Sequence, residues 1–169
     1  SLVAQSIEST LSEKDEIAAI VSELLPTTRS AFYIGRKQDY YVAMEASLKL
    51  KEISYIQCEG FAAGELKHGT ISLIEKGTPV LALISNNEEV AAHTRGNVME
   101  TVARGASAIT IVEEGVARED DTIVINQVHP YLSAISMVIP TQLIAYYASM
   151  QRGLDVDKPR NLAKAVTVE

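Results

Sequence analysis

Two glutamates and a lysine whose spacing matches a helix are the residues in this sequence best suited to acid–base chemistry. Glu45, Lys49 and Glu52 lie in the segment 39–55, whose apolar periodicity predicts a helix. At about 100° per residue, their side chains fall within about 60° of one another and form one stripe. A carboxylate beside an ammonium group and a second carboxylate can serve as a general base whose pKa is set by its neighbours. The stripe is therefore a candidate catalytic centre.

The residues that flank this stripe decide whether it is a surface ion pair or part of a catalytic cleft. An exposed Glu45/Lys49 pair would be worth only a few tenths of a kcal/mol and would need no function. Apolar residues flank the stripe, on one side Val42, Ala46, Leu50 and Ile53 and on the other Met44 and Leu48. The solvent face is expected to be that of Ala43, Ser47 and Lys51. Since charges inside a buried arc are costly unless they are paired or line a polar cavity, the pattern favours a catalytic cleft.

An α/β architecture is expected to position these residues. Apolar periodicity and helix stop signals predict helices at 2–25, 39–55, 88–104 and 133–152. Short apolar runs predict strands at 31–34, 80–84, 108–112 and 122–125. Apolar strands that alternate with helices indicate a mostly parallel sheet covered on both faces, so we expect a three-layer α/β domain. Two polar segments, 57–69 and 154–169, are expected to be irregular and to carry function.

Composition limits the classes of partner. The 169 residues suffice for one domain, and 47% hydrophobic against 5% aromatic residues indicates an aliphatic core. A net charge of −7 argues against nucleic acid and anionic membranes, which both need clustered Lys and Arg. The single cysteine, Cys58, cannot form an internal disulfide and is interpreted as a packing residue. No apolar run reaches the ~18 to 20 residues of a membrane span, so we expect a soluble, cytoplasmic protein.

Three stretches, 45–55, 63–69 and 159–169, together resemble the isomerase domain of the glucosamine-6-phosphate synthase family, whose members are also called glutamine:fructose-6-phosphate amidotransferases. The resemblance extends from Ala31 to the last residue and is most specific in the final stretch. It implies a flavodoxin-like sugar-isomerase (SIS) domain with a five-stranded, mostly parallel sheet, the second of two such domains that follow a glutaminase domain. It divides the chain into a helical lead-in at 1–30, the SIS domain at 31–153 and a catalytic tail at 154–169. The opening at Ser1, without a lead-in, is interpreted as a boundary inside a longer protein.

The resemblance also implies catalytic roles for the stripe and for a histidine. Glu52 would move a proton between C1 and C2 of the open-chain sugar, with Glu45 and Lys49 as its support. His68 would transfer a proton at the ring oxygen in the active site of the partner subunit, which requires a homodimer. These roles suit the residue types, since a carboxylate can carry the aldose–ketose proton and a histidine titrates near neutrality.

The tail supplies the remaining implied site residues. Lys164 would form an imine with the C2 ketone of fructose-6-phosphate and open the ring, with Arg160 in a supporting role and Ala163 against the substrate. Taken singly, Lys164 would be an ordinary solvated side chain and His68 a partner for a helix dipole. Without a preceding domain on which the tail can dock, Lys164 is expected to be poorly positioned. The resemblance implies no metal and no cofactor.

The phosphate-binding half of the site is expected outside this chain. Only the segments 35–37 and 85–88 follow strands as candidate phosphate loops, and the second carries an acidic side chain where the phosphate would sit. The phosphate cradle and the glutaminase nucleophile should therefore lie in the preceding SIS and glutaminase domains. We expect a parent enzyme that converts fructose-6-phosphate and glutamine to glucosamine-6-phosphate and glutamate in amino-sugar biosynthesis. The fragment alone is expected to be inactive.

Two other functions compete with the synthase. A stand-alone SIS isomerase or deglycase would need its own Ser/Thr-rich phosphate loop, which the sequence does not offer. A SIS sugar-phosphate sensor attached to a DNA-binding domain would need neither the imine lysine nor the glutamates. The joint presence of Glu52 and Lys164 favours the synthase over both.

Overall fold

Five parallel strands form one sheet in the order β2-β1-β3-β4-β5. The computed structural model describes residues 1–161. Its strands are β1 (Ser30–Gly35), β2 (Gln57–Ala62), β3 (Pro79–Ile84), β4 (Ser107–Glu113) and β5 (Ile123–Ile125). Every pair of neighbouring strands is parallel and β3 is buried along its whole length, which is typical of a sheet covered on both faces. This order places the switch point of the sheet between β1 and β3, as in flavodoxin-like folds.

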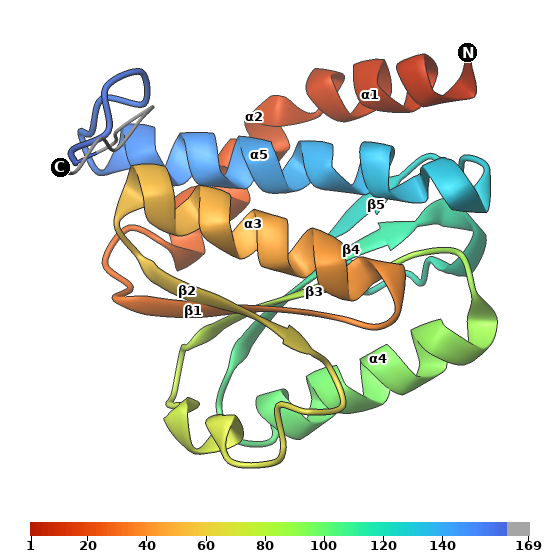
Figure 1. Ribbon diagram of the computed structural model, residues 1–169, viewed down its shortest axis with the longest axis horizontal. Coiled ribbons are helices and arrows are strands. Elements are labelled where there is room, and N and C mark those ends of the chain that lie inside the picture. Colours follow the sequence, from red (N-terminus) through yellow and green to blue (C-terminus); the bar gives the residue numbers. More distant parts are fainter. Residues whose placement is uncertain (162–169) are drawn as a thin grey trace, which may run out of the picture.

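Helices cover both faces of the sheet (Figure 1). They are α1 (Leu2–Ser12), α2 (Lys14–Leu24), α3 (Gln38–Ser54), α4 (Glu88–Val102) and α5 (Ser133–Gln151), and short 3-10 turns are η1 (Thr70–Leu73), η2 (Glu114–Val116) and η3 (Pro130–Leu132). The helices α2, α3 and α5 share one core with alternate strand residues such as Tyr33 and Leu83. On the opposite face, Val98 of α4 packs with Phe32 and Val80. The predicted three-layer α/β fold with a five-stranded parallel sheet is confirmed.

The strand β2 lies where the sequence predicted an irregular polar segment, 57–69. It pairs with β1 at the edge of the sheet, and only Cys58 among its residues is fully buried. An edge strand with polar outer positions lacks the continuous apolar run by which central strands are recognised. A Cβ at Gly60 would lie 2.7 Å from the backbone oxygen of Ala43 on α3. The glycine that suggested a loop therefore allows the close approach of strand and helix.

The N-terminal helix predicted over 2–25 is two helices that meet at Glu13. Glu13 has φ −93° and ψ 11°, and its N–H donates to the Thr10 oxygen at 3.2 Å, an i→i+3 bond that ends α1. From this point α2 inserts Ile17 and Val21 into the core, while α1 crosses α5 and reaches β5. The bend lets both segments follow the surface of α5.

The helix α3 is rotated relative to its expected solvent face. Ala43 and Ser47, which were expected to face solvent, are 0% and 3% exposed. Met44 and Leu48 are instead 47% and 46% exposed. Because α3 packs against both the sheet and α5, the small side chains face the close contact at Gly60 and the longer ones point outward. Helical periodicity could not show this, because apolar residues occur on both flanks.

One segment of the described residues 1–161 has the length and mean hydropathy of a membrane span. Pro130–Gln151 comprises 22 residues with a hydropathy of 1.2 in its most apolar window. Half of that window is buried, since α1, α2 and α3 all pack on α5. A helix enclosed by other elements is apolar around its circumference for the same reason as a central strand. The apolarity of α5 is accounted for by its place in the core.

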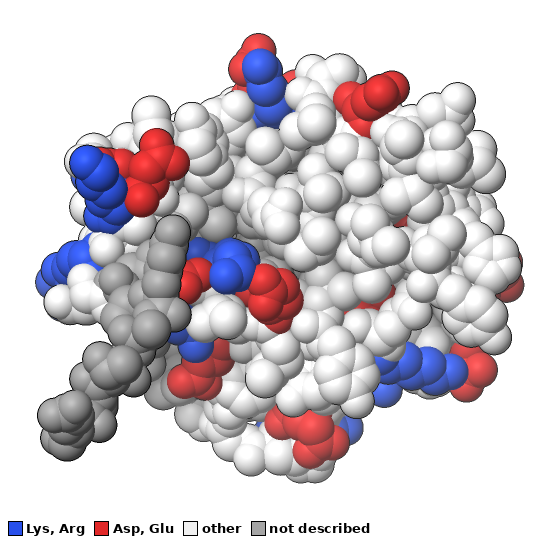
Figure 2. All heavy atoms as spheres, turned by 45° about the horizontal axis from the view of Figure 1, so that its top comes forward, with Lys and Arg blue, Asp and Glu red and all other residues white. Residues whose placement is uncertain are grey.

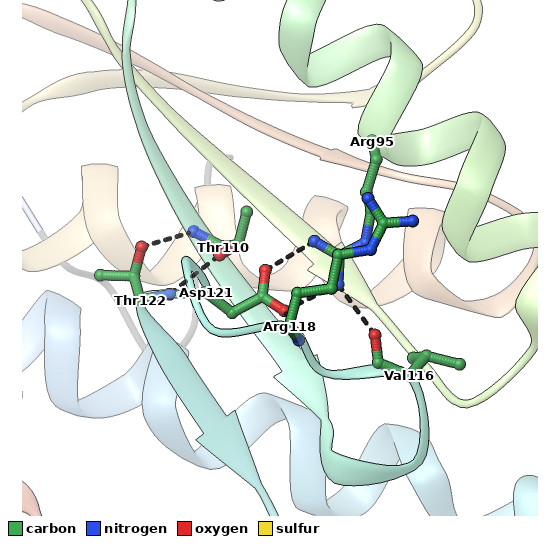
Figure 3. Close-up of polar contacts among 6 residues, drawn as sticks. All are labelled: Arg95, Thr110, Val116, Arg118, Asp121 and Thr122. Carbon is green, nitrogen blue, oxygen red and sulfur yellow. Dashed lines mark hydrogen bonds and ion pairs between the residues drawn. The ribbon is translucent and has the colours of Figure 1, made fainter.

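A buried ion pair ties the connection between β4 and β5 to α4 (Figure 3). Arg95 Nη1 and Nη2 donate to the two carboxylate oxygens of Asp121 at 2.6 and 2.7 Å, and the Asp121 side chain is 1% exposed. Arg95 Nη2 also donates to the Val116 oxygen, and the Arg118 N–H donates to Asp121 Oδ2. Burial would raise the pKa of Asp121, but these hydrogen bonds hold it below its usual value. The loop that follows Glu113 is thereby fixed.

Candidate functional site

The stripe predicted on α3 is present, and it is half-exposed. Lys49 Nζ lies 2.8 Å from Glu52 Oε2 and 3.8 Å from Glu45 Oε1. The side chains of Glu45, Lys49 and Glu52 are 46%, 37% and 28% exposed, so the expectation that they lie inside a buried arc is wrong. The rotation of α3 brings them outward. The hydrogen bond to Glu52 raises the pKa of Lys49, so the ammonium stays protonated beside the carboxylate.

Two hollows lie on either side of this stripe. One, of about 790 Å³, lies between α3 and β2 and is lined by Glu45, Met44 and Phe61 among others. The second, of about 630 Å³, lies between α1, α3 and α5 and is lined by Lys49 and Tyr146 among others. Figure 2 shows that charged side chains gather in small groups on this mostly uncharged face. The stripe thus faces outward beside two mostly apolar hollows.

The first part of the tail is attached to the C-terminal end of α3. Tyr55 is the C-cap residue of α3 and has a left-handed backbone with φ 61°. Arg160 donates its backbone N–H to Tyr55 Oη at 2.8 Å, and its guanidinium carbon lies 4.0 Å from the centre of the Tyr55 ring. A cation–π contact of this kind is worth about 0.5–1 kcal/mol at an exposed site. Arg160 is therefore held beside the turn that follows Glu52. The sequence analysis did not single out Tyr55.

Of the other predicted site residues, Ala163 and Lys164 lie outside the described part of the chain. The expectation that Lys164 is poorly positioned therefore stays a prediction. His68 is exposed in the segment after β2. This segment packs Leu66 into the core on the α4 face, whereas Glu52 lies on the helix that covers the opposite face (Figure 1). Within one chain, His68 is not brought together with Glu52.

A second group of ionisable side chains, which the sequence analysis missed, lies at the switch point of the sheet. Asp39 in the first turn of α3 and Glu113 at the end of β4 are each 1% exposed. Asp39 Oδ2 accepts hydrogen bonds from the N–H and the hydroxyl of Ser85, both at 3.0 Å. Burial raises the pKa of Asp39 to about 6, against these hydrogen bonds and with a smaller contribution from the Glu113 charge. In sequence, an aspartate in a first helical turn indicates only a helix start.

The raised pKa of Asp39 predicts that stability depends on pH. The folded state binds this proton at about pH 6 and the unfolded chain at about 3.8, so stability rises as the pH falls from above 6 towards 4. Asp39→Asn keeps the shape without the charge. It should raise the free energy of unfolding by about 1 to 2 kcal/mol at about pH 7.5 and by much less at about pH 4.5. Urea unfolding at the two pH values measures this, and an equal effect at both would contradict it.

Comparison with known proteins identifies relatives of this chain. The family model described as SIS domain matches residues 24–152. Over all 169 residues, the chain is 97% identical to glutamine–fructose-6-phosphate aminotransferase (isomerizing) of Lactococcus lactis subsp. lactis (strain IL1403). It is 80% identical to the protein of the same name from Streptococcus pyogenes serotype M6. The chain spans 28% of the length of each of these relatives.

Solved structures agree with these similarities. The C-terminal domain of glucosamine-fructose-6-phosphate aminotransferase from Francisella tularensis matches with a TM-score of 0.85 and 34% identity, over 92% of this chain and 44% of that chain. Glucosamine-6-phosphate deaminase from Thermotoga maritima matches with a TM-score of 0.70 and 22% identity, over 95% of this chain and 49% of that chain. The second likeness shows the fold alone. The resemblance based on 45–55, 63–69 and 159–169 is confirmed.

Proposed function

Because this chain belongs to the SIS domain family, we propose that it is the second sugar-isomerase half of an enzyme that converts fructose-6-phosphate and glutamine to glucosamine-6-phosphate and glutamate. The observation that carries this proposal is the 97% identity over the whole chain to a glutamine–fructose-6-phosphate aminotransferase (isomerizing). Since the chain spans 28% of that relative, the remainder would supply the glutaminase domain and the first SIS domain. Residues 31–153 would form the second SIS domain and 154–169 the catalytic tail.

Glu52 is the proposed base for the aldose–ketose proton transfer. It would take a proton from C1 of the open-chain sugar and return one to C2, while the C1 hydroxyl proton passes to the nitrogen, so that a C2 imine becomes an amine and the C1 alcohol becomes an aldehyde. The ammonium of Lys49 supports this role because, at 2.8 Å from Glu52 Oε2, it holds the carboxylate in one orientation and balances its charge. Glu45 would in turn hold Lys49 from the preceding turn of the helix.

The tail is proposed to supply the amine that handles the ketone. Lys164 would open the sugar ring and form an imine at C2 with loss of water, with Ala163 against the substrate. Ammonia released from glutamine would then add at C2 and displace the Lys164 amine, which leaves the C2 imine on which Glu52 acts. The contacts of Arg160 with Tyr55 support a tail that enters the site close to Glu52. An amine forms an imine most easily when burial lowers its pKa, and docking of the tail on the first SIS domain would provide that burial.

His68 is proposed to serve the active site of a second subunit. Its exposed position on the α4 side of the sheet, away from the helix that carries Glu52, supports this assignment. An imidazole can both accept and donate a proton, which suits proton transfer at the ring oxygen. The proposal therefore includes a homodimer, and it places the enzyme in amino-sugar biosynthesis in the cytoplasm.

The substrate phosphate is proposed to bind outside this chain. The loop after β3 lies against two buried carboxylates, Asp39 and Glu113, which accept its N–H groups at Ser85 and Asn86, and their negative charge opposes a phosphate there. The hollowed, mostly uncharged face over α3 and α5 supports contact with the first SIS domain there (Figure 2). A cradle on that domain would complete the site above Glu52.

A chimera tests the proposed function. This chain replaces the corresponding segment of the Lactococcus lactis relative, and synthesis of glucosamine-6-phosphate is compared with that of the unmodified relative. Because the two sequences are 97% identical, a comparable rate is expected. A chimera that folds and hydrolyses glutamine but makes no glucosamine-6-phosphate would contradict the proposal. The 169-residue chain alone is the control, and turnover of fructose-6-phosphate by it would favour a stand-alone isomerase.

A further inference from the structure

A polar pocket lies at the C-terminal ends of β1, β3 and β4, apart from the stripe of Glu45, Lys49 and Glu52. Its volume is about 270 Å³, and its lining includes Arg36, Lys37, Ser85, Asn86, Glu113 and Ser133. It occupies the switch point between β1 and β3, where open α/β sheets bind ligands. The helix α3 begins beside this pocket, and Glu52 lies near its other end, about 20 Å along the helix axis.

Two residues that line this pocket each have a buried polar atom with no hydrogen-bond partner among residues 1–161. The atoms are Oε1 of Glu113 and Oγ of Ser133, and both residues are 1% exposed. The other carboxylate oxygen, Glu113 Oε2, accepts the N–H of Asn86 at 2.6 Å, which fixes the side chain. Buried polar atoms in folded proteins are almost always paired. A ligand in the pocket would supply the partners that these two atoms lack.

The lining of the pocket includes one buried carboxylate, Glu113, and a second, Asp39, accepts hydrogen bonds from the lining residue Ser85. Neither Glu113 nor Asp39 has a Lys, Arg or His nitrogen within 4.0 Å in the described part of the chain. Arg36 instead donates from Nε and Nη2 to Asn97 Oδ1 at 3.2 and 2.9 Å, and Lys37 is exposed. Among residues 1–161, no three His, Cys, Asp or Glu side chains are grouped to hold a metal ion. An organic cation is the complement that these carboxylates lack.

We propose that this pocket binds a small ligand with a primary ammonium group next to hydroxyl groups, namely an amino sugar. The ammonium would donate to Glu113 Oε1 and offset its charge, while Ser133 Oγ would hydrogen-bond a neighbouring hydroxyl. The amides of Asn86 and Asn87 also line the pocket and suit further hydroxyls. A pocket of about 270 Å³ has room for one sugar ring. This inference does not rest on the proposed synthase reaction.

Calorimetric titration of the 169-residue chain with glucosamine tests the proposal, with glucose as the matched neutral sugar. Glucosamine should bind at least about tenfold more tightly than glucose, because only its ammonium makes a charge-assisted hydrogen bond with Glu113. Equal affinities, or no saturable binding of glucosamine, would overturn the proposal.

Substitutions locate the site. Glu113→Gln should weaken glucosamine binding at least about tenfold, while the exposed neighbour substitution Glu114→Gln should change nothing. Ser133→Ala removes an unpaired buried hydroxyl, so it should keep the melting temperature and weaken binding about threefold. If Glu113→Gln does not fold, Ser133→Ala alone tests whether glucosamine binds in this pocket. Unchanged affinity in a folded Ser133→Ala or Glu113→Gln variant would overturn the site. Glu52→Gln should not alter glucosamine binding, which separates this test from that of the proposed function.

Discussion

Glu52→Gln is expected to lower kcat for glucosamine-6-phosphate synthesis by roughly 10² to 10⁴-fold in the chimera, because general-base catalysis contributes on this order. Glutamine has the size of glutamate, and its carboxamide oxygen can still accept the hydrogen bond from Lys49 that Glu52 Oε2 accepts at 2.8 Å. It cannot accept a proton from C1. The KM for fructose-6-phosphate should change little, and glutamine hydrolysis in the glutaminase domain should continue. Steady-state assays of both products measure these quantities.

A matched substitution on α2, which packs on the same face of the sheet as α3, controls for this result. Glu23 on α2 is exposed and lies outside the stripe, so Glu23→Gln should leave kcat unchanged. If Glu52→Gln retained more than about a tenth of the original kcat, another group would have to carry the proton between C1 and C2. A fall in kcat with an equal fall in glutamine hydrolysis would instead indicate a folding defect.

Asp121→Asn is expected to lower the free energy of unfolding by about 2 to 4 kcal/mol at neutral pH, since removal of one partner leaves Arg95 with a buried, uncompensated charge. The carboxylate accepts from both terminal nitrogens of Arg95 and from the Arg118 N–H. Because these bonds lower the pKa of Asp121, its contribution is present above the unfolded value of 3.8 and is lost as the pH falls through the folded value. The difference between wild type and variant should therefore narrow in acid. Urea unfolding across pH measures it.

The neighbouring aspartate provides the control for this second prediction. Asp120 is exposed, and Asp120→Asn should change the free energy of unfolding by no more than about 0.5 kcal/mol. If the two variants lost equal stability, the effect would come from the net charge of the loop and not from the pair with Arg95 (Figure 3).

The parts of this fold that sequence could predict are those set by local pattern. The strands β1, β3 and β4 are mostly apolar because both of their faces are covered, and their positions follow from that pattern. The close spacing of Glu45, Lys49 and Glu52 follows from helix geometry alone, and the structure brings these charges together as predicted. Their exposure could not be predicted, because it depends on which neighbours α3 packs against.

The parts that sequence could not predict depend on contacts between distant segments. The strand β2 is recognisable only through its pairing with β1, and the break at Glu13 only through the different surfaces that α1 and α2 cover. Asp39 and Glu113 are far apart in sequence and meet because the strand order places the end of β4 beside β3. No spacing rule connects two such carboxylates. Lone glutamates after apolar runs therefore carry no signal until the topology is known.

Gly60 limits the directions in which this sequence can evolve. Every other amino acid would put a Cβ within 2.7 Å of the Ala43 oxygen, so strand and helix would have to separate. The helix α3 carries Asp39 near one end and Glu52 near the other. A displacement of α3 away from β2 would therefore move both side chains at once. A map of tolerated substitutions based on activity would thus mark Gly60 as strongly as a catalytic residue. The intolerance at Gly60 would reflect the close packing of β2 on α3 and not a contact with substrate.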